Sequence, residues 1–260
     1  MDRLIISTDD NETYLNFFPI VVTAWKKLFD VPVSLAYVTD KPEDDPTVAK
    51  MRDYGEVHLF PVVEGVPAGN QAKMARFFLA SMYPDDVCMV NDIDTAPLSA
   101  EYFERVLSQH VSGSILAVGA EVYHGSPHEG KFPIGEITAT GKVFKELVNP
   151  NDFDFKTYIE SFRNIRVFDH KETILSSEFS DESLLRALLA VTEVPVVHAR
   201  RDVNIHSDWI DRSWWSIDED KLQSGGYVLV NFLRPLMPNL EHIRTIIKYI
   251  YNGKEFEDIF

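Results

Sequence analysis

Two aspartates, Asp92 and Asp94, follow the apolar run of residues 87–90 and have only Ile93 between them. At the end of a strand, alternate side chains point to the same side, so both carboxylates would face one ligand while Ile93 turns toward the core. Mg²⁺ and Mn²⁺ prefer carboxylate oxygens as ligands, together with water and substrate phosphates. The pair therefore predicts a divalent-cation site beside a bound phosphate. The alternative interpretation is two solvated loop acids.

The spacing of these aspartates is weak support by itself. A chain with 22 Asp among 260 residues contains about two Asp-x-Asp triplets by chance, and this one has three, beginning at Asp92, Asp152 and Asp218. Only the triplet at Asp92 ends an apolar run of the kind that forms a buried strand. Its context, more than its spacing, singles it out.

The elements that must position this pair can be read from the first hundred residues. Apolar, β-branched runs predict strands at residues 4–7, 33–38, 57–62 and 87–90. Apolar side chains at helical spacing predict helices at residues 14–29, 47–54 and 72–83. This alternation predicts an α/β fold with a mostly parallel central sheet and helices on both faces.

Polar side chains follow three of the four predicted strands. The segments are STDDN at residues 7–11, TDK at residues 39–41 and NDID at residues 91–94. In open α/β sheets ligands bind outside the carboxyl ends of the strands. We therefore expect these three segments to converge on one binding edge.

The pattern beyond residue 94 is less regular. We expect a strand at 115–118, helices at 138–147 and 181–189, short strands at 194–197 and 227–230, and a closing helix at 240–251. No internal repeat and no low-complexity linker interrupts the chain. The sequence therefore predicts a single domain over residues 1–260.

Charge and composition restrict the partners. The chain has 25 basic and 41 acidic residues, a net charge of −16, which argues against nucleic acid because phosphate binding needs clustered Lys and Arg. No stretch approaches the roughly 20 apolar residues of a membrane span, so we expect no transmembrane segment and a cytoplasmic location, in its own cell or in a host. The single cysteine, Cys88, lies in an apolar run and is typical of a buried structural thiol.

The segment NQAKMARFFLASMYPDDVCMVNDIDTAPL, residues 70–98, resembles the nucleotide-sugar-dependent glycosyltransferases of the GT-A fold. In that family a basic and aromatic helix precedes an apolar strand that ends in DxD. A less specific resemblance extends from Leu4 through Pro238. It implies a Rossmann-like GT-A domain with a nucleotide-binding half (1–98) and an acceptor-binding half (99–260). It also implies a UDP- or GDP-sugar donor, a Mn²⁺ or Mg²⁺ ion, and transfer of a hexosyl or pentosyl group to a glycan or other hydroxyl acceptor.

The resemblance implies roles for individual residues at the donor site. Asp94 would bind the metal directly, and Asp92 would reach the metal or the ribose. Thr8, Asp9 and Asp10 would hold the base and ribose, and Asp40 would lie near the nucleoside. Lys73 or Arg76 would contact phosphate or the donor sugar. For the two basic residues, the alternative is ordinary exposed charge on a helix.

A third metal ligand is expected late in the chain. The segment GYVLVNFLRPLMPN, residues 226–239, resembles the family's late strand and loop, where a His commonly completes the metal sphere. Asn231 stands at the matching position here. An amide oxygen can coordinate Mg²⁺ or Mn²⁺, and His206 is the rival candidate.

Acidic and aromatic residues in the second half suit the sugar. Asp181 and Glu182 begin a predicted helix, and in the family an acid at such a position lies beside the donor sugar; the helix dipole alone is the alternative explanation. The resemblance leans toward a retaining reaction. The segment SDWIDRSWW, residues 207–215, holds three of the four Trp and suits either sugar recognition or packing under a loop.

Two other functions remain open. Haloacid-dehalogenase-like phosphatases also place Asp-x-Asp at a strand end, but there the motif opens the fold and a Gly-Thr usually follows the second Asp, whereas here it ends the fourth strand. A non-catalytic nucleotide-sugar-binding protein is the other alternative, and the Asn in place of the usual His favours it. The oligomeric state is left open.

Overall fold

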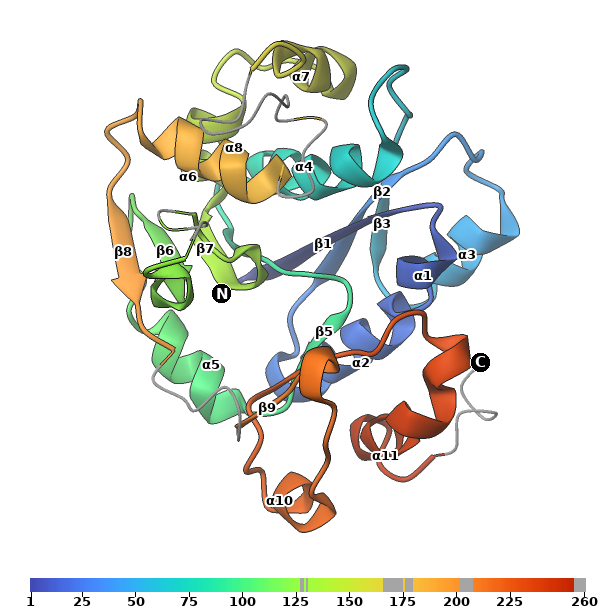
Figure 1. Cartoon of the computed structure of the whole chain (residues 1–260). Helices are drawn as coiled ribbons and strands as arrows, with labels where there is room; N and C mark the ends of the chain where they lie inside the picture. The colour runs from blue at the N-terminus through green and yellow to red at the C-terminus, as the bar shows by residue number, and fades with distance from the viewer. Residues whose placement is uncertain (127–128, 130, 166–174, 176–179, 202–207, 255–260) are drawn as a thin grey trace.

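The structure is a computed structural model of the whole chain (Figure 1). It describes residues 1–126, 129, 131–165, 175, 180–201 and 208–254. Within these residues, no helix is both long enough and apolar enough to cross a membrane.

A central sheet of seven strands organises the described residues, in the order β3-β2-β1-β4-β7-β6-β8. The strands are β1 (Arg3–Asp9), β2 (Val33–Val38), β3 (Glu56–Phe60), β4 (Val87–Val90), β6 (Ile115–Val118), β7 (Ile137–Thr140) and β8 (Val196–Ala199). All neighbours pair in parallel except β7, which is antiparallel to both β4 and β6. The predicted α/β fold with a mostly parallel sheet is confirmed.

Helices cover both faces of this sheet (Figure 1). One face packs against α2 (Phe18–Phe29), α5 (Ala100–Leu107) and α11 (Leu240–Ile250), and the other against α4 (Ala68–Ser81), α6 (Gly141–Val148), α7 (Phe155–Ser161) and α8 (Ser180–Leu189). Strand β1 shows why its sequence is apolar throughout. Leu4 and Ile6 pack on the α2 side and Ile5 on the α4 side, all fully buried, as a central parallel strand requires.

Shorter elements connect these layers. They are α1 (Glu12–Leu15), α3 (Pro46–Arg52), α10 (Glu219–Gln223) and the 3₁₀ turns η1 (Ala120–Tyr123), η2 (Ile134–Glu136), η4 (Arg212–Trp214) and η5 (Met237–Asn239). Residues 14–29, expected to form one helix, are divided between α1 and α2, and Pro19 lies in the first turn of α2, where its missing N–H costs nothing.

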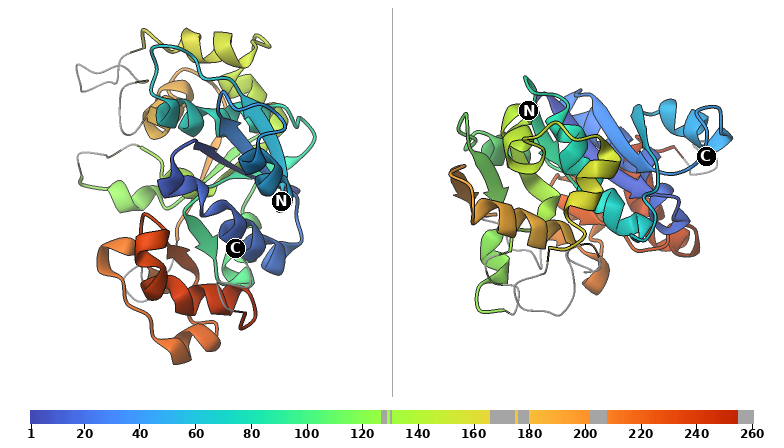
Figure 2. Two further views of the ribbon diagram at one scale, coloured as in Figure 1. Left: turned by 90° about the vertical axis from the view of Figure 1, so that its right-hand side faces the viewer. Right: turned by 90° about the horizontal axis from the view of Figure 1, so that it is seen from above.

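A small second sheet brings late segments of the chain beside the Asp92–Asp94 region. It consists of β5 (Thr95–Pro97), β10 (Leu229–Asn231) and β9 (Trp209–Ile210), with β10 antiparallel to β5 and parallel to β9. Its buried side chains share one hydrophobic core with α2 and α11. In the left view of Figure 2, the orange and red segments that include β9, β10 and α11 gather at the lower end of the molecule.

The expectation of one helix over residues 138–147 is wrong in its first part. Residues Ile137–Thr140 form β7, and α6 begins at Gly141, with the Thr140 hydroxyl accepting from the Val143 N–H at 3.4 Å. The β-branched sequence ITAT suits a strand that inserts between β4 and β6. Gly141 is needed at the junction because a Cβ there would lie 2.0 Å from the carbonyl oxygen of Tyr83.

Other boundaries shift by a few residues. The strand expected at 194–197 is β8, and the one expected at 227–230 is β10. Elements β5, β9, α5 and α7 were not anticipated.

Candidate functional site

A pocket of about 420 Å³ lies at the carboxyl ends of β1 and β4. These two strands are neighbours, and the chain order of the strands reverses between them, which is where open α/β sheets bind ligands. Eight predicted site residues line it: Thr8, Asp9, Lys73, Arg76, Asp92, Asp94, Asp181 and Glu182. A separate hollow of about 530 Å³, bounded by residues 61–65 and α7, contains none of the predicted residues. The sheet edge at which the sequence predicted ligand binding therefore coincides with a pocket.

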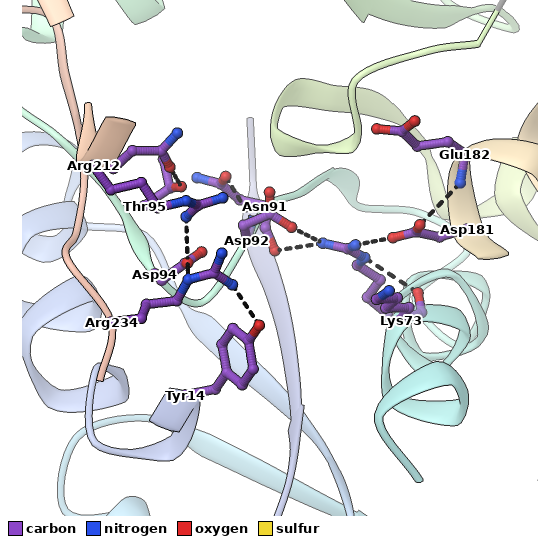
Figure 3. Close-up of polar contacts among 12 residues, drawn as sticks. Tyr14, Lys73, Asn91, Asp92, Asp94, Thr95, Asp181, Glu182, Arg212 and Arg234 are labelled. Atoms are coloured by element: carbon purple, nitrogen blue, oxygen red, sulfur yellow. Dashed lines mark hydrogen bonds and ion pairs between the residues drawn. The ribbon is translucent and has the colours of Figure 1, made fainter. Parts of the chain in front are cut away.

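Asp92 follows the last paired residue of β4. The Asn91 N–H donates to the Ile5 carbonyl at 2.9 Å and so extends the β1–β4 pairing up to the motif. The Asp92 carboxylate, 46% exposed, accepts from Nη1 of Arg76 at 2.7 Å (Figure 3). Partial desolvation in the pocket would raise the pKa of Asp92, but the charge and hydrogen bond of Arg76, with the charges of Arg212 and Arg234, hold that pKa below its usual value. Asp92 is therefore a carboxylate at neutral pH.

Asp94 lies deeper and faces two arginines that the sequence analysis did not select. Its Oδ2 accepts from Nη1 of Arg212 at 2.7 Å and lies 3.2 Å from Nε of Arg234 (Figure 3). Burial and the nearby charge of Asp92 raise the pKa of Asp94, and the two arginines oppose that rise. The backbone N–H of Phe232 donates to the Asp94 carbonyl at 2.9 Å, so β10 is attached directly to the motif.

Arg76, on α4, joins the motif to α8. Its buried guanidinium donates to Asp92, to the Asn91 carbonyl at 3.1 Å and, through Nη2, to Asp181. Its Nε donates to the Lys73 carbonyl at 3.2 Å. Burial would lower the pKa of Arg76, but the charges of Asp181 and Asp92 raise it, so the side chain stays cationic. Arg76 thus acts within this structure as an internal link between two acids.

Glu182 lines the pocket beside Asp181. Its Oε1 accepts from the Tyr123 hydroxyl at 2.8 Å, and its Oε2 is buried with no hydrogen-bond partner in the described part of the chain. Burial raises the pKa of Glu182 to about 7, against the effect of the Tyr123 hydrogen bond and with help from the charges of Asp181 and Asp92. Unlike Asp181, Glu182 makes no ion pair with Arg76 among the contacts of the described residues. It is the acid best placed to exchange a proton near neutral pH.

The last residues of β1 face the pocket, and the residue that follows them contacts the neighbouring strand. Thr8 and Asp9 line the pocket, and an added Cβ on Gly69, at the start of α4, would make an ordinary van der Waals contact with Oδ2 of Asp9 at 3.5 Å. Asp10 instead accepts from the hydroxyls of Tyr37 (2.5 Å) and Thr39 (2.8 Å). Asp10 does not line the pocket, and its contact with the nucleoside stays a prediction.

Asp40 also lies outside the pocket lining. Its Oδ1 accepts from the backbone N–H of Val62 at 3.0 Å, which fixes the chain just after β3. A role for Asp40 near the nucleoside stays a prediction. His206, the rival metal ligand, lies outside the described residues.

Asn231, at the end of β10, holds the second sheet together. Its Oδ1 accepts from the Thr95 hydroxyl at 2.6 Å, and its Nδ2 donates to Oδ2 of Asp211 at 3.0 Å. Both ends of the amide therefore have protein partners, and neither Asp92 nor Asp94 is among them. Metal ligation by Asn231 stays a prediction that these contacts do not favour.

The donor set can be tested against the divalent cation that the fold family implies. Asp92 and Asp94 already form ion pairs with three guanidinium groups, those of Arg76, Arg212 and Arg234. Within the residues that the structure describes, no three His, Cys, Asp or Glu side chains are grouped so as to hold a metal ion. Carboxylates paired with arginines are poor partners for a further cation, because like charges repel over these distances. In the described arrangement the site does not fit a divalent metal.

The residues missed by the sequence analysis come mainly from the second sheet. Arg212 follows β9 and Arg234 follows β10, and both line the pocket with Tyr14 and Asn70. Of the three clustered Trp, Trp209 is buried under Arg201, while Trp214, next to the pocket-lining Arg212 turn, is 41% exposed. The adjacent Asp and Arg within SDWIDRSWW were a possible sign of a functional segment. The two-residue strand there shows no periodic pattern, so the sequence could not place this segment beside Asp94.

Comparisons with known proteins bear on the fold. No family model and no curated protein matches this sequence. A crystal structure of the galactosyltransferase LgtC in complex with donor and acceptor sugar analogs has a TM-score of 0.52 and 10% identity, covering 97% of this chain and 96% of that one. An active-site mutant of LgtC has a TM-score of 0.51 and 11% identity, covering 88% and 86%. The likeness establishes the GT-A fold for this chain.

Proposed function

We propose that this protein is a glycosyltransferase, which moves a hexosyl or pentosyl group from a nucleoside-diphosphate sugar to a hydroxyl of a glycan or other glycoside. The observation that carries the proposal is the convergence of Asp92, Asp94, Asp181 and Glu182 on one pocket of a GT-A fold. These acids come from segments about ninety residues apart, after β4 and at the start of α8. Such a gathering of charge in a cleft is typical of a functional site.

In the proposed complex, the donor lies along the carboxyl ends of β1 and β4. Thr8 and Asp9 at the end of β1 and Lys73 on α4 line this pocket. We assign Thr8 and Asp9 to the nucleoside and Lys73 to its phosphates or sugar. The division into a nucleotide-binding half, residues 1–98, and an acceptor-binding half, residues 99–260, belongs to the same proposal. Arg212 and Arg234 modify that division, because they reach the donor pocket from the second half.

Glu182 is the residue that we assign to the reacting sugar. In the transfer, the bond between the anomeric carbon and the diphosphate oxygen breaks with its electron pair on that oxygen, and the acceptor oxygen bonds to the carbon. The carbon passes through an oxocarbenium-like state that a nearby carboxylate stabilises. In a retaining reaction, toward which the proposal leans, the acceptor proton goes to the departing diphosphate; in an inverting one Glu182 takes it. With a pKa of about 7, Glu182 can act as the carboxylate beside the oxocarbenium-like carbon or as the base that takes the acceptor proton.

The divalent cation enters no step of this proposal. Mn²⁺ or Mg²⁺ on Asp92 and Asp94 would act as a Lewis acid on the departing diphosphate. Metal binding at this site stays a prediction, which a metal titration tests. A cytoplasmic location likewise stays a prediction.

The test is a donor panel. The full chain is incubated with UDP- and GDP-sugars, with and without Mn²⁺, and release of the nucleoside diphosphate is followed by chromatography. We expect slow hydrolysis of one donor class. Glu182→Gln should keep donor binding and lower turnover by about 100-fold, because Gln can neither stabilise the oxocarbenium-like carbon with a negative charge nor take the acceptor proton, and a positioned acid–base group contributes on that order. Glu104→Gln, an exposed position on α5, is the matched control and should leave turnover unchanged.

Two results would replace the proposal. Release of phosphate from phosphorylated sugars in the presence of Mg²⁺, without any cleavage of nucleotide sugars, would identify a phosphatase. Tight binding of a nucleotide sugar with no turnover, with or without candidate glycoside acceptors, would identify a binding protein.

A further inference from the structure

We propose that Arg212 and Arg234 bind the diphosphate of the donor and take the role that a divalent cation was predicted to fill. This inference rests on the proposed function. It also reinterprets Asp94, which becomes a positioning residue for two arginines in place of a metal ligand.

The two guanidinium groups converge on one atom. Nη1 of Arg212 donates to Oδ2 of Asp94 at 2.7 Å, and Nε of Arg234 lies 3.2 Å from the same oxygen (Figure 3). Both side chains line the pocket, with exposed fractions of 35% and 28%, whereas the Asp94 side chain beneath them is only 7% exposed. The Asp94 carboxylate therefore lies beneath the two guanidinium groups, and these groups are the part of the cluster that a ligand would contact.

Charge favours an anion at this point. The carboxylate of Asp94 is shared by two guanidinium groups, so these three side chains together carry a net positive charge. Asp92 and Asp181 share the one guanidinium of Arg76 and offset that charge, so the preference for an anion comes from the position of Arg212 and Arg234 at the pocket lining above Asp94. A divalent cation placed on Asp94 would be repelled by both arginines, whereas the negative charges of a diphosphate would be attracted by them.

Each arginine keeps donors for a ligand. A guanidinium has five N–H groups in a plane that matches phosphate oxygens. The contacts within the described residues engage Nη1 of Arg212, and Nε and Nη1 of Arg234. Donors on both groups remain to face the pocket.

Both arginines are held in place before any ligand arrives. Nη1 of Arg234 donates to the Tyr14 hydroxyl, and its guanidinium carbon lies 5.0 Å from the centre of the Tyr14 ring. Arg212 follows Asp211, whose carboxylate accepts from the Ser213 N–H at 2.8 Å and from Nδ2 of Asn231 at 3.0 Å. Preorganised donors stabilise a departing anion without the cost of rearrangement. The second sheet thus supplies a fixed pair of cations at the mouth of the donor pocket.

The test is isothermal titration of the full chain with UDP and with GDP, in EDTA and in Mn²⁺. We expect the nucleoside diphosphate that binds to do so with the same affinity, within about threefold, in both solutions. Arg212→Gln and Arg234→Gln should each weaken this binding in EDTA by at least about tenfold and should leave binding of the uncharged nucleoside unchanged, whereas each Lys variant should recover part of the loss. Arg52→Gln, on α3 and exposed, is the matched control without effect.

A further variant separates the two roles of Asp94 and does not depend on the arginine variants folding. If Asp94 only positions the arginines, Asp94→Asn should retain nucleoside-diphosphate binding in EDTA within about tenfold of the wild type. If Asp94 is a metal ligand, the same variant should lose binding that Mn²⁺ supports in the wild type. Binding that vanishes in EDTA and returns with Mn²⁺ overturns this inference and leaves the proposed function standing. Failure of every nucleoside diphosphate and nucleotide sugar to bind in either solution overturns both.

Discussion

Arg76 on α4 and Asp181 in the first turn of α8 form a buried ion pair between residues 105 positions apart in the sequence. The same guanidinium donates to Asp92, so one arginine is shared by an acid that follows β4 and an acid of a distant helix. Without this arginine, the segment after β4 and the start of α8 would bring two carboxylates together at the wall of the pocket. Four predictions follow from this and related contacts.

Replacing Arg76 with Met should destabilise the fold by about 3–5 kcal/mol, because Asp181 would remain buried without its partner. Urea unfolding at pH 7, followed by circular dichroism, measures the loss. Arg52→Met is the control, since Arg52 and Glu43 form an exposed pair that should contribute less than about 1 kcal/mol. Equal stability losses in the two variants would show that the buried link is not a structural requirement.

Glu182 should make stability depend on pH. Its pKa is about 7 in the folded protein against an ordinary value of 4.5, so between these values the folded state holds a proton that the unfolded state has released. The resulting stabilisation is present below about pH 4.5 and is lost as the pH rises to about 7. Glu182→Gln should therefore be the more stable protein at pH 8, by about 2 kcal/mol, and similar to the wild type at pH 4.5.

The measurement for Glu182 is thermal unfolding of both proteins across this pH range. Glu104→Gln serves as the control, and its difference from the wild type should stay constant with pH. A Glu182→Gln difference that does not change with pH would mean that the carboxyl titrates normally.

Asn231→Asp tests whether the amide links segments or binds metal. A carboxylate there would face Oδ2 of Asp211, now 3.0 Å from the Asn231 amide nitrogen, and would lose a donor. We expect a loss of about 1–3 kcal/mol at pH 7 that Mn²⁺ does not reverse. Asn252→Asp, at an exposed position, is the control. Recovery of stability on adding Mn²⁺ would support the predicted metal ligand instead.

Gly141→Ala should destabilise the junction of β7 and α6. The new Cβ would lie 2.0 Å from the Tyr83 carbonyl oxygen, a backbone atom that cannot move aside freely, so we expect a loss of about 3 kcal/mol in urea unfolding. Gly69→Ala is a matched change inside α4, where the nearest atom lies 3.5 Å away; it should be neutral or stabilise by up to about 1 kcal/mol. A neutral Gly141→Ala would indicate that this junction can open.

Much of the first half could be predicted because its elements are long and each shows its own period. Strand β1 is buried on both faces, and α4 repeats apolar side chains along its length, so local pattern and final fold agree. The position of Thr8, Asp9 and Asp92 at one edge then followed from the geometry of parallel sheets. The error over residues 138–147 arose where a four-residue strand directly precedes a helix. The apolar spacing of the helix extended the predicted helix backwards over the strand, because four residues are too few to show a strand period of their own.

The sequence by itself determined the α/β alternation, the edge at which the pocket forms and the acids that line it, since these depend on hydrophobic period and on residue type. Only the tertiary structure decided which cations those acids meet. Arg212 and Arg234 reach Asp94 because β9 and β10 pair beside β5, with Asn231 opposite Thr95 across 136 residues. Strands of two or three residues carry no periodic signal, and their register is set by backbone hydrogen bonds to distant partners that form only when the whole chain folds.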